Sequence, residues 1–250
     1  MKISKKEWDS YISKLSRINK TASDLVRQYA ETNGLDDIKS LIDYSYKIAQ
    51  KYGNASASLN ALMYDTIAEL EGVVLPPAEL APLPEYGDVA KAVQGTLKTS
   101  QNFEEIGGAV GRLVKMTGQD TMLRNAIRDK AEFAWIPVGE TCAFCITLAS
   151  RGWQPISNKA LRNGHAEHIH SNCDCSYMVR HNSKFDVAGY HPEKYKKMYY
   201  DAEGNKPKDK INAMRREFYA DNREEILEQK ASAYEKRKEL NSSNAEETQA

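Results

Sequence analysis

Four cysteines, gathered in two close pairs, constrain this chain more than any other feature of its sequence. Cys142 and Cys145 stand in the stretch TCAFC, and Cys173 and Cys175 stand in HSNCDC, which begins with His170. Zinc binds four sulfur or nitrogen donors in a tetrahedron, and structural sites commonly take two donors from a Cys-X-X-Cys turn and two from a second turn. The spacing therefore predicts a structural Zn²⁺ site that ties the two stretches together.

Five donors compete for the four positions of this predicted site. Cys142 and Cys145 supply two of them. His170 and Cys173 are separated by the two-residue spacer that a turn uses to aim both groups inward, which favours that pair. Cys175 replaces His170 if Cys-Asp-Cys begins an extended segment, in which alternate side chains fall on one face. Both sets stay open, and the predicted metal ligands are four of these five residues.

Disulfide bonds are the main alternative use of the cysteines. The amino terminus, MKISKKEWDSYISKL, has no apolar stretch of signal-peptide length, and about 18 consecutive apolar residues, as a membrane span requires, occur nowhere. We therefore expect a cytosolic protein, and disulfides are rare in a reducing compartment. Metal binding is the better interpretation.

One enzymatic arrangement is matched in part. His165-Ala166-Glu167 fits the His-X-Glu of zinc deaminases, in which a water occupies the fourth zinc position. In those enzymes the His-X-Glu precedes a Pro-Cys-X-X-Cys, whereas here the order is reversed and the proline is missing. His170 and Cys173 would also fill the open position. We assign no catalytic residue and expect that the chain is not an enzyme.

The charge balance bears on the class of partner. The chain has 35 basic and 35 acidic residues among 250, so its formal net charge is zero. A protein that mainly neutralises phosphates carries a net positive charge. Packed DNA is therefore expected to be a weak partner at most.

The apolar pattern predicts a mainly α fold: a helical body, a small α+β zinc-binding module and a long C-terminal helix. Helices are predicted from Lys5 to about Tyr29, Ile38 to Lys51 and Ser56 to Glu71, with a break at YGNAS. Helical pattern returns from Val89 to about Phe133, interrupted by glycines. SYMVRH is predicted as a strand, and a short helix is predicted to begin at Pro192.

These elements suggest six segments along the chain. They are an N-terminal helical region (1–74), a Pro-rich linker or strap (75–88), central helices (89–134), a zinc-knuckle module (135–205), a charged C-terminal helix (206–240) that begins near Lys210, and a disordered tail (241–250). The tail has nothing to bury, which is typical of disorder.

The order TCAFCITLASRGW, HxxCDC and GYHPEKYKKMY resembles the C-terminal part of the MuF-like minor capsid (head morphogenesis) proteins of tailed bacteriophages and prophages. The resemblance runs from about Trp135 to Asp201. It departs at SYMVRH, where the family pattern has an apolar strand that ends in proline. The family's metal ligands would fall on Cys142, Cys145, His170, Cys173 and Cys175.

This resemblance implies a minor structural protein of the phage head that acts in capsid assembly or DNA delivery near the portal. Its expected partners are the portal and capsid proteins, with packaged DNA bound weakly and no membrane. The expected location is the virion, after assembly in the host cytoplasm. The alternative is a zinc-dependent enzyme acting on nucleic acid, or an ADP-ribosyltransferase-like toxin, which a metal site with an exchangeable water would favour.

Overall fold

The chain forms two compact units. A computed structural model describes residues 2–100, 102–139, 141–156 and 174–224, together with 227–228, 231–232 and 235. The main unit contains residues 1–141 and 151–192, and the C-terminal unit contains residues 142–150 and 193–250.

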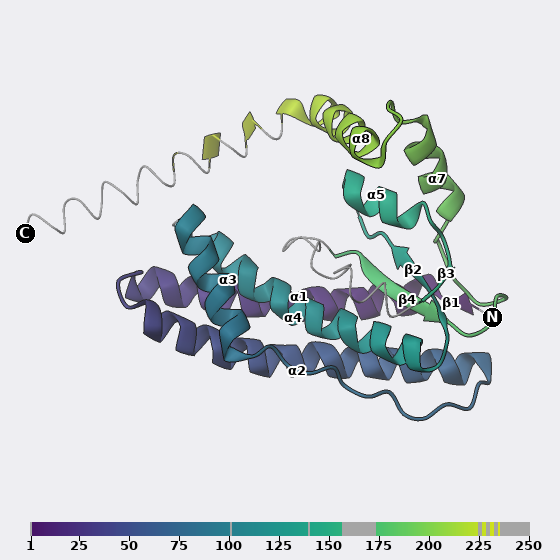
Figure 1. The fold of residues 1–250 in the computed structure, drawn as a ribbon, viewed down its shortest axis with the longest axis horizontal. Coiled ribbons are helices and arrows are strands. Elements are labelled where there is room, and N and C mark those ends of the chain that lie inside the picture. Colours follow the sequence, from purple (N-terminus) through teal and green to yellow (C-terminus); the bar gives the residue numbers. More distant parts are fainter. Residues whose placement is uncertain are drawn as a thin grey trace, which may run out of the picture. The chain divides into compact units, whose positions relative to one another are not determined.

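The fold is mainly helical, as predicted, with small sheets (Figure 1). The main unit holds, in chain order, β1 (Lys2–Ile3), α1 (Lys5–Asn33), α2 (Ile38–Glu71), α3 (Tyr86–Thr99), α4 (Phe103–Arg128), β2 (Glu132–Ile136), β3 (Gln154–Pro155), β4 (Ser176–Arg180) and β5 (Asp186–Val187). The C-terminal unit holds α5 (Ala143–Ala149), α7 (Pro192–Asp201, whose first residue belongs to the main unit) and α8 (Pro207–Asp221).

Helices α1, α2 and α4 pack on one another and form the centre of the main unit, with α3 beside α2 and α4 (Figure 1). Their shared apolar core is contributed by all four helices. It consists of Ala22, Val26, Ala30, Leu41, Ile42, Ile48, Ala49, Val89, Val93, Ile106, Val110 and Val114.

The ends of the first two helices follow the sequence signals. Ser4 and Glu7 form a capping box at the start of α1, and Gly34 ends that helix with a φ of 72°. Asp37 caps α2 by accepting a hydrogen bond from the Ser40 N–H at 3.0 Å. Side-chain acceptors at these positions satisfy N–H groups that the helix itself leaves unpaired.

The predicted break at YGNAS is wrong, because α2 runs without interruption from Ile38 to Glu71. Gly53 is buried inside the helix, as are Ser56 and Asn60 one and two turns further on. A glycine in a helix costs only about 1 kcal/mol relative to alanine. Burial of the surrounding face against α4 offsets that penalty.

The glycines of α4 do not interrupt that helix either. A Cβ on Gly107 would lie 2.4 Å from the backbone oxygen of Ser23 on α1, and one on Gly118 would lie 2.3 Å from the Ser56 hydroxyl on α2. Glycine therefore allows α4 to approach both neighbours more closely than any other residue would. The predicted interruptions are close packing contacts.

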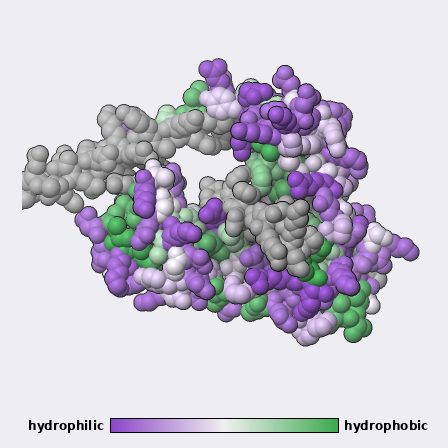
Figure 2. All heavy atoms as spheres, viewed as in Figure 1, coloured by the Kyte–Doolittle hydropathy of each residue, from purple (hydrophilic) through white to green (hydrophobic). Residues whose placement is uncertain are grey.

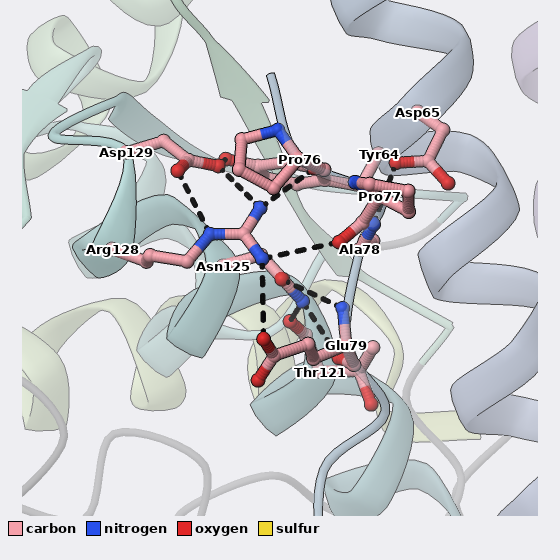
Figure 3. A network of polar contacts seen from close by, with 10 residues as sticks. All are labelled: Tyr64, Asp65, Pro76, Pro77, Ala78, Glu79, Thr121, Asn125, Arg128 and Asp129. Atoms are coloured by element: carbon pink, nitrogen blue, oxygen red, sulfur yellow. Dashed lines mark hydrogen bonds and ion pairs between the residues drawn. The ribbon is translucent and has the colours of Figure 1, made fainter.

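The Pro-rich segment between α2 and α3 is a strap bound by side chains, as Figure 3 shows. The Asn125 side chain accepts a hydrogen bond from the Glu79 N–H at 2.9 Å and donates one to the Glu79 carbonyl at 2.8 Å. Arg128 donates to the carbonyls of Pro76 and Pro77, at 3.0 and 3.1 Å. Because prolines prevent this segment from joining a sheet or helix, side chains of α4 satisfy its backbone instead.

A three-stranded antiparallel sheet of order β3-β2-β4 completes the main unit. The predicted strand at SYMVRH is confirmed as β4, although Ser176 to Val179 are all buried and do not alternate. The predicted helix to Phe133 is wrong, because α4 ends at Arg128 and β2 begins at Glu132. Lys130, with a φ of 55°, turns the chain between them.

In the C-terminal unit, α5, α7 and α8 share a small core. Ala143, Ile146 and Met214 are buried there, and Tyr195, Tyr199, Ala202 and Ile211 pack against them. The predicted helix at Pro192 is confirmed as α7. The helix predicted from Lys210 to Leu240 begins earlier, at Pro207; α8 ends at Asp221, and the described residues 223–224, 227–228, 231–232 and 235 are also helical. The tail, 241–250, lies outside the described residues.

Hydrophilic side chains dominate the visible face, and hydrophobic ones occur in small separate groups (Figure 2). No helix in the described ranges is both long enough and apolar enough to cross a membrane.

The close contact between α1 and α4 predicts that a larger residue at Gly107 destabilises the fold. Gly107→Ala should lower the free energy of unfolding by about 1–3 kcal/mol, because the new methyl group meets rigid backbone and the two helices must separate. Urea denaturation followed by circular dichroism measures this change.

Gly95→Ala is the matched control, since a Cβ there has no neighbour within 4 Å on the exposed side of α3. It should be neutral or stabilising by up to about 1 kcal/mol. Equal effects at the two glycines would contradict the packing role of Gly107.

Candidate functional site

Cys142 and Cys145 occupy the first turn of α5 in the C-terminal unit. Cys142 is the N-cap residue, and its carbonyl accepts the Ile146 N–H at 3.0 Å. Cys145 lies inside the helix and is only 1% exposed, whereas Cys142 is partly exposed. The Cys-X-X-Cys motif therefore spans the start of a helix, with Cys145 inside α5, whereas the sequence predicted that both cysteines lie in a turn.

Cys175 directly precedes β4 in the main unit and is 2% exposed. Its Sγ accepts a hydrogen bond from the Val138 N–H at 3.4 Å. The next residue, Ser176, pairs with Ile136 at the end of β2, so the thiol lies where the β2–β4 ladder ends. Backbone N–H donation to sulfur favours a thiolate, the form in which cysteine binds metals.

The other predicted ligands cannot be located in the same way. His170 and Cys173, together with His165 and His168, lie outside the described residues. Cys142 and Cys145 belong to one unit and Cys175 to the other. Within the described ranges, three or more histidine, cysteine or acidic side chains nowhere gather as a metal site would require. The choice among the five candidate ligands therefore stays a prediction.

Gln119 of α4 fixes the start of β4, and sequence analysis missed it. Its side chain donates to the Ser176 hydroxyl at 2.8 Å and accepts the Tyr177 N–H at 3.0 Å. Gln119 is 1% exposed, so both bonds are shielded from water. A single glutamine within a helical pattern gives no signal of this role; only the pairing of distant segments reveals it.

A second polar cluster surrounds His181, which the sequence placed outside any site. The Glu71 carboxylate accepts hydrogen bonds from the backbone N–H groups of His181 and Asn182, at 2.8 and 2.7 Å. The imidazole meets the Tyr64 ring edge-on, with 5.5 Å between centroids. The Tyr64 hydroxyl in turn donates to Asp129 at 2.7 Å.

Burial and hydrogen bonding set the charges of this cluster. Desolvation lowers the pKa of His181, and the charges of Glu71 and Asp129 oppose this effect without cancelling it. Burial works against ionisation of Asp129, but hydrogen bonds from Arg128 and Tyr64 hold its pKa below the usual value. At neutral pH the cluster therefore contains a neutral imidazole beside an ionised carboxylate.

The family model described as VG15 protein matches residues 2–202. The chain belongs to the VG15 protein family. The match spans all helices and strands of the main unit, the four cysteines, α5 and α7. Neither a curated protein nor a solved structure matches the chain.

Membership in the VG15 family, a family of phage gene products, indicates a phage-encoded protein. The resemblance noted in the sequence implied a phage origin, and this part of the expectation is supported. The match does not specifically identify the MuF-like family. A role as a MuF-like minor capsid protein is therefore a proposal.

The lowered pKa of His181 predicts how stability depends on pH. The unfolded state, with a histidine pKa near 6.5, takes up the proton before the folded state does. The contribution of His181 to the free energy of unfolding is therefore fully present above that pH and decreases as the pH drops below it. His181→Gln should lose less stability between about pH 7.5 and 5.5 than the wild type.

Urea midpoints measured at both pH values test this expectation. His191→Gln, which changes an exposed histidine, is the control and should keep the wild-type dependence. An unchanged slope in His181→Gln would show that the imidazole titrates alike in both states.

Proposed function

We propose that this VG15 family member is a minor structural protein of a tailed-phage head, stabilised by zinc and acting in capsid assembly or DNA delivery near the portal. The observation that carries the proposal is the family match over residues 2–202, which includes the whole stretch that resembles MuF-like proteins. A virion location, with assembly in the host cytoplasm, follows from the same reasoning.

The described cysteines fit a structural zinc site in their chemistry. Cys145 and Cys175 are almost completely buried, and a backbone N–H is directed at the sulfur of Cys175. Val138, which donates that bond, is only four residues before Cys142 in the chain. Cys173, with either His170 or Cys175, would complete the donor set, with Zn²⁺ as a structural ion.

The proposed contacts with portal or capsid proteins involve α8 and the residues that follow it. This helix carries seven charged residues among its 15, yet Phe218 and Tyr219 are 40% and 41% exposed. Partly exposed aromatic side chains among charges are typical of transient protein interfaces. Balanced charge favours contacts that weaken in high salt, and DNA affinity is expected to be low.

Metal content tests the zinc part of the proposal. Purified protein should contain one Zn²⁺ per chain, and Cys145→Ser should abolish it, because removal of one of four ligands opens the site. Limited proteolysis should then cut the C-terminal third more rapidly. Full zinc content in Cys145→Ser would remove this site from the proposal.

X-ray absorption at the zinc edge distinguishes the two ligand sets. One nitrogen and three sulfur neighbours would assign His170, whereas four sulfurs would assign Cys175 in its place. His170→Ala should lower zinc affinity more than Cys175→Ala in the first case and less in the second.

Composition of purified phage particles tests the structural role. The protein should be present at low copy number in heads and should co-purify with the portal at low salt. Truncation after Asn222 keeps Met214 in its core position and should preserve zinc content while reducing incorporation. Absence of the full-length protein from particles would exclude the structural role and favour the alternative, a zinc-dependent enzyme or an ADP-ribosyltransferase-like toxin.

A further inference from the structure

Lys115 of α4 is buried inside the main unit without a partner among the described residues. The residue is 5% exposed, and its side-chain nitrogen is shielded from water. Lysine is almost never buried to this degree unless a negative group accompanies it. Because an isolated ammonium is strongly unfavourable in a protein interior, the burial of Lys115 points to a compensating negative charge.

Two further polar atoms near Lys115 also lack partners. Asn19 Oδ1 on α1 and Ser56 Oγ on α2 are buried, and like Lys115 Nζ they form no hydrogen bond with the described residues. The three residues line one pocket, together with Gln119 and Ser176, whose side chains bind each other at 2.8 Å. Since the three atoms do not bind one another, a group that lies between them would satisfy all three.

The pocket limits the size of this group. Its volume is about 10 Å³, which leaves room for about one water-sized molecule or ion. Polyatomic anions such as sulfate and phosphate are too large for this space. The pocket is partly open to solvent, so a small ion can enter it while the main unit remains folded.

The charge of the lining favours an anion over water. Lys115 supplies three N–H donors, and the Ser56 hydroxyl can donate as well. The Asn19 amide can turn its NH₂ group toward the pocket, since its two ends have the same shape. Asp174 also borders the pocket, but it is exposed, so solvent screens its charge. A water accepts these hydrogen bonds but leaves the positive charge of Lys115 uncompensated.

We propose that this pocket binds one small monovalent anion of the size of chloride, held by Lys115, Ser56 and Asn19. The ion joins α1, α2 and α4, because each of these helices contributes one of the three side chains. It therefore stabilises the main unit, since a ligand that binds only the folded state lowers the population of the unfolded state. The inference is independent of the proposed zinc site, because none of the described candidate zinc ligands lines the pocket.

The chloride dependence of stability tests the proposal in solution. Urea unfolding of the full chain is measured in mixtures of sodium chloride and sodium gluconate at constant ionic strength, so that general screening does not change. Gluconate is too large for the pocket. The unfolding constant should decrease as chloride replaces gluconate, by roughly tenfold at a chloride concentration ten times Kd. Equal constants in both salts would overturn the proposal.

Two lysine variants locate the effect. Lys115→Met keeps an unbranched side chain but removes its charge, and it should lose the chloride dependence whether it is more or less stable than the wild type. Lys20→Met is the matched control, because it removes a lysine next to Asn19 whose side chain is 75% exposed. This control should keep the wild-type dependence. Chloride dependence that persists in Lys115→Met would place the ion elsewhere and contradict the site.

Anomalous diffraction from wild-type crystals grown in bromide locates the ion directly and does not depend on how any variant folds. One bromide peak is expected within hydrogen-bond distance of Lys115 Nζ and Ser56 Oγ. A water at that position, or a carboxylate of this chain paired with Lys115, would overturn the proposal. A bromide peak without chloride-dependent stability in solution would indicate an adventitious ion only and would likewise overturn it.

Discussion

The close approach of α4 to α1 and α2 is the constraint on which the rest of the main unit depends. Gly107 and Gly118 remove the side chains that would hold these helices apart. The close packing holds α4 in place beside β4, where the Gln119 amide reaches Ser176 and Tyr177. Dispersion contacts at such short distances add to the hydrophobic burial that drives the packing.

Side chains of α4 also form hydrogen bonds with backbone groups that neighbouring segments leave unpaired. Asn125 and Arg128 bind the Pro-rich strap, and Gln119 binds the start of β4. One helix therefore holds both the strap and the first residues of a strand. The Gln119 bonds are buried and the Asn125 bonds to Glu79 are partly buried, so loss of either side chain would leave a shielded backbone group unsatisfied, which is more damaging than loss of the exposed Arg128 bonds.

The sequence predicted what depends on local signals and missed what depends on distant partners. The starts of α1 at Lys5 and of α2 at Ile38 were predicted correctly, because the apolar pattern that marks them is local. The break expected at Gly53 was wrong because tertiary packing outweighs a small local preference. The role of Gln119 could not be predicted, since it requires knowing that α4 and β4 are neighbours.

The parallel pairing of β1 with β5 has a consequence for how the chain folds during synthesis. Ile3 pairs with Val187, and its side chain is 1% exposed. The first strand leaves the ribosome long before its partner, because synthesis adds roughly 5–20 residues per second. Helices α1, α2 and α4 can associate in the meantime, since their contacts are complete by Arg128. Strand β1 therefore has no partner until β5 has been synthesised, and Ile3 lacks its pairing with Val187 until then.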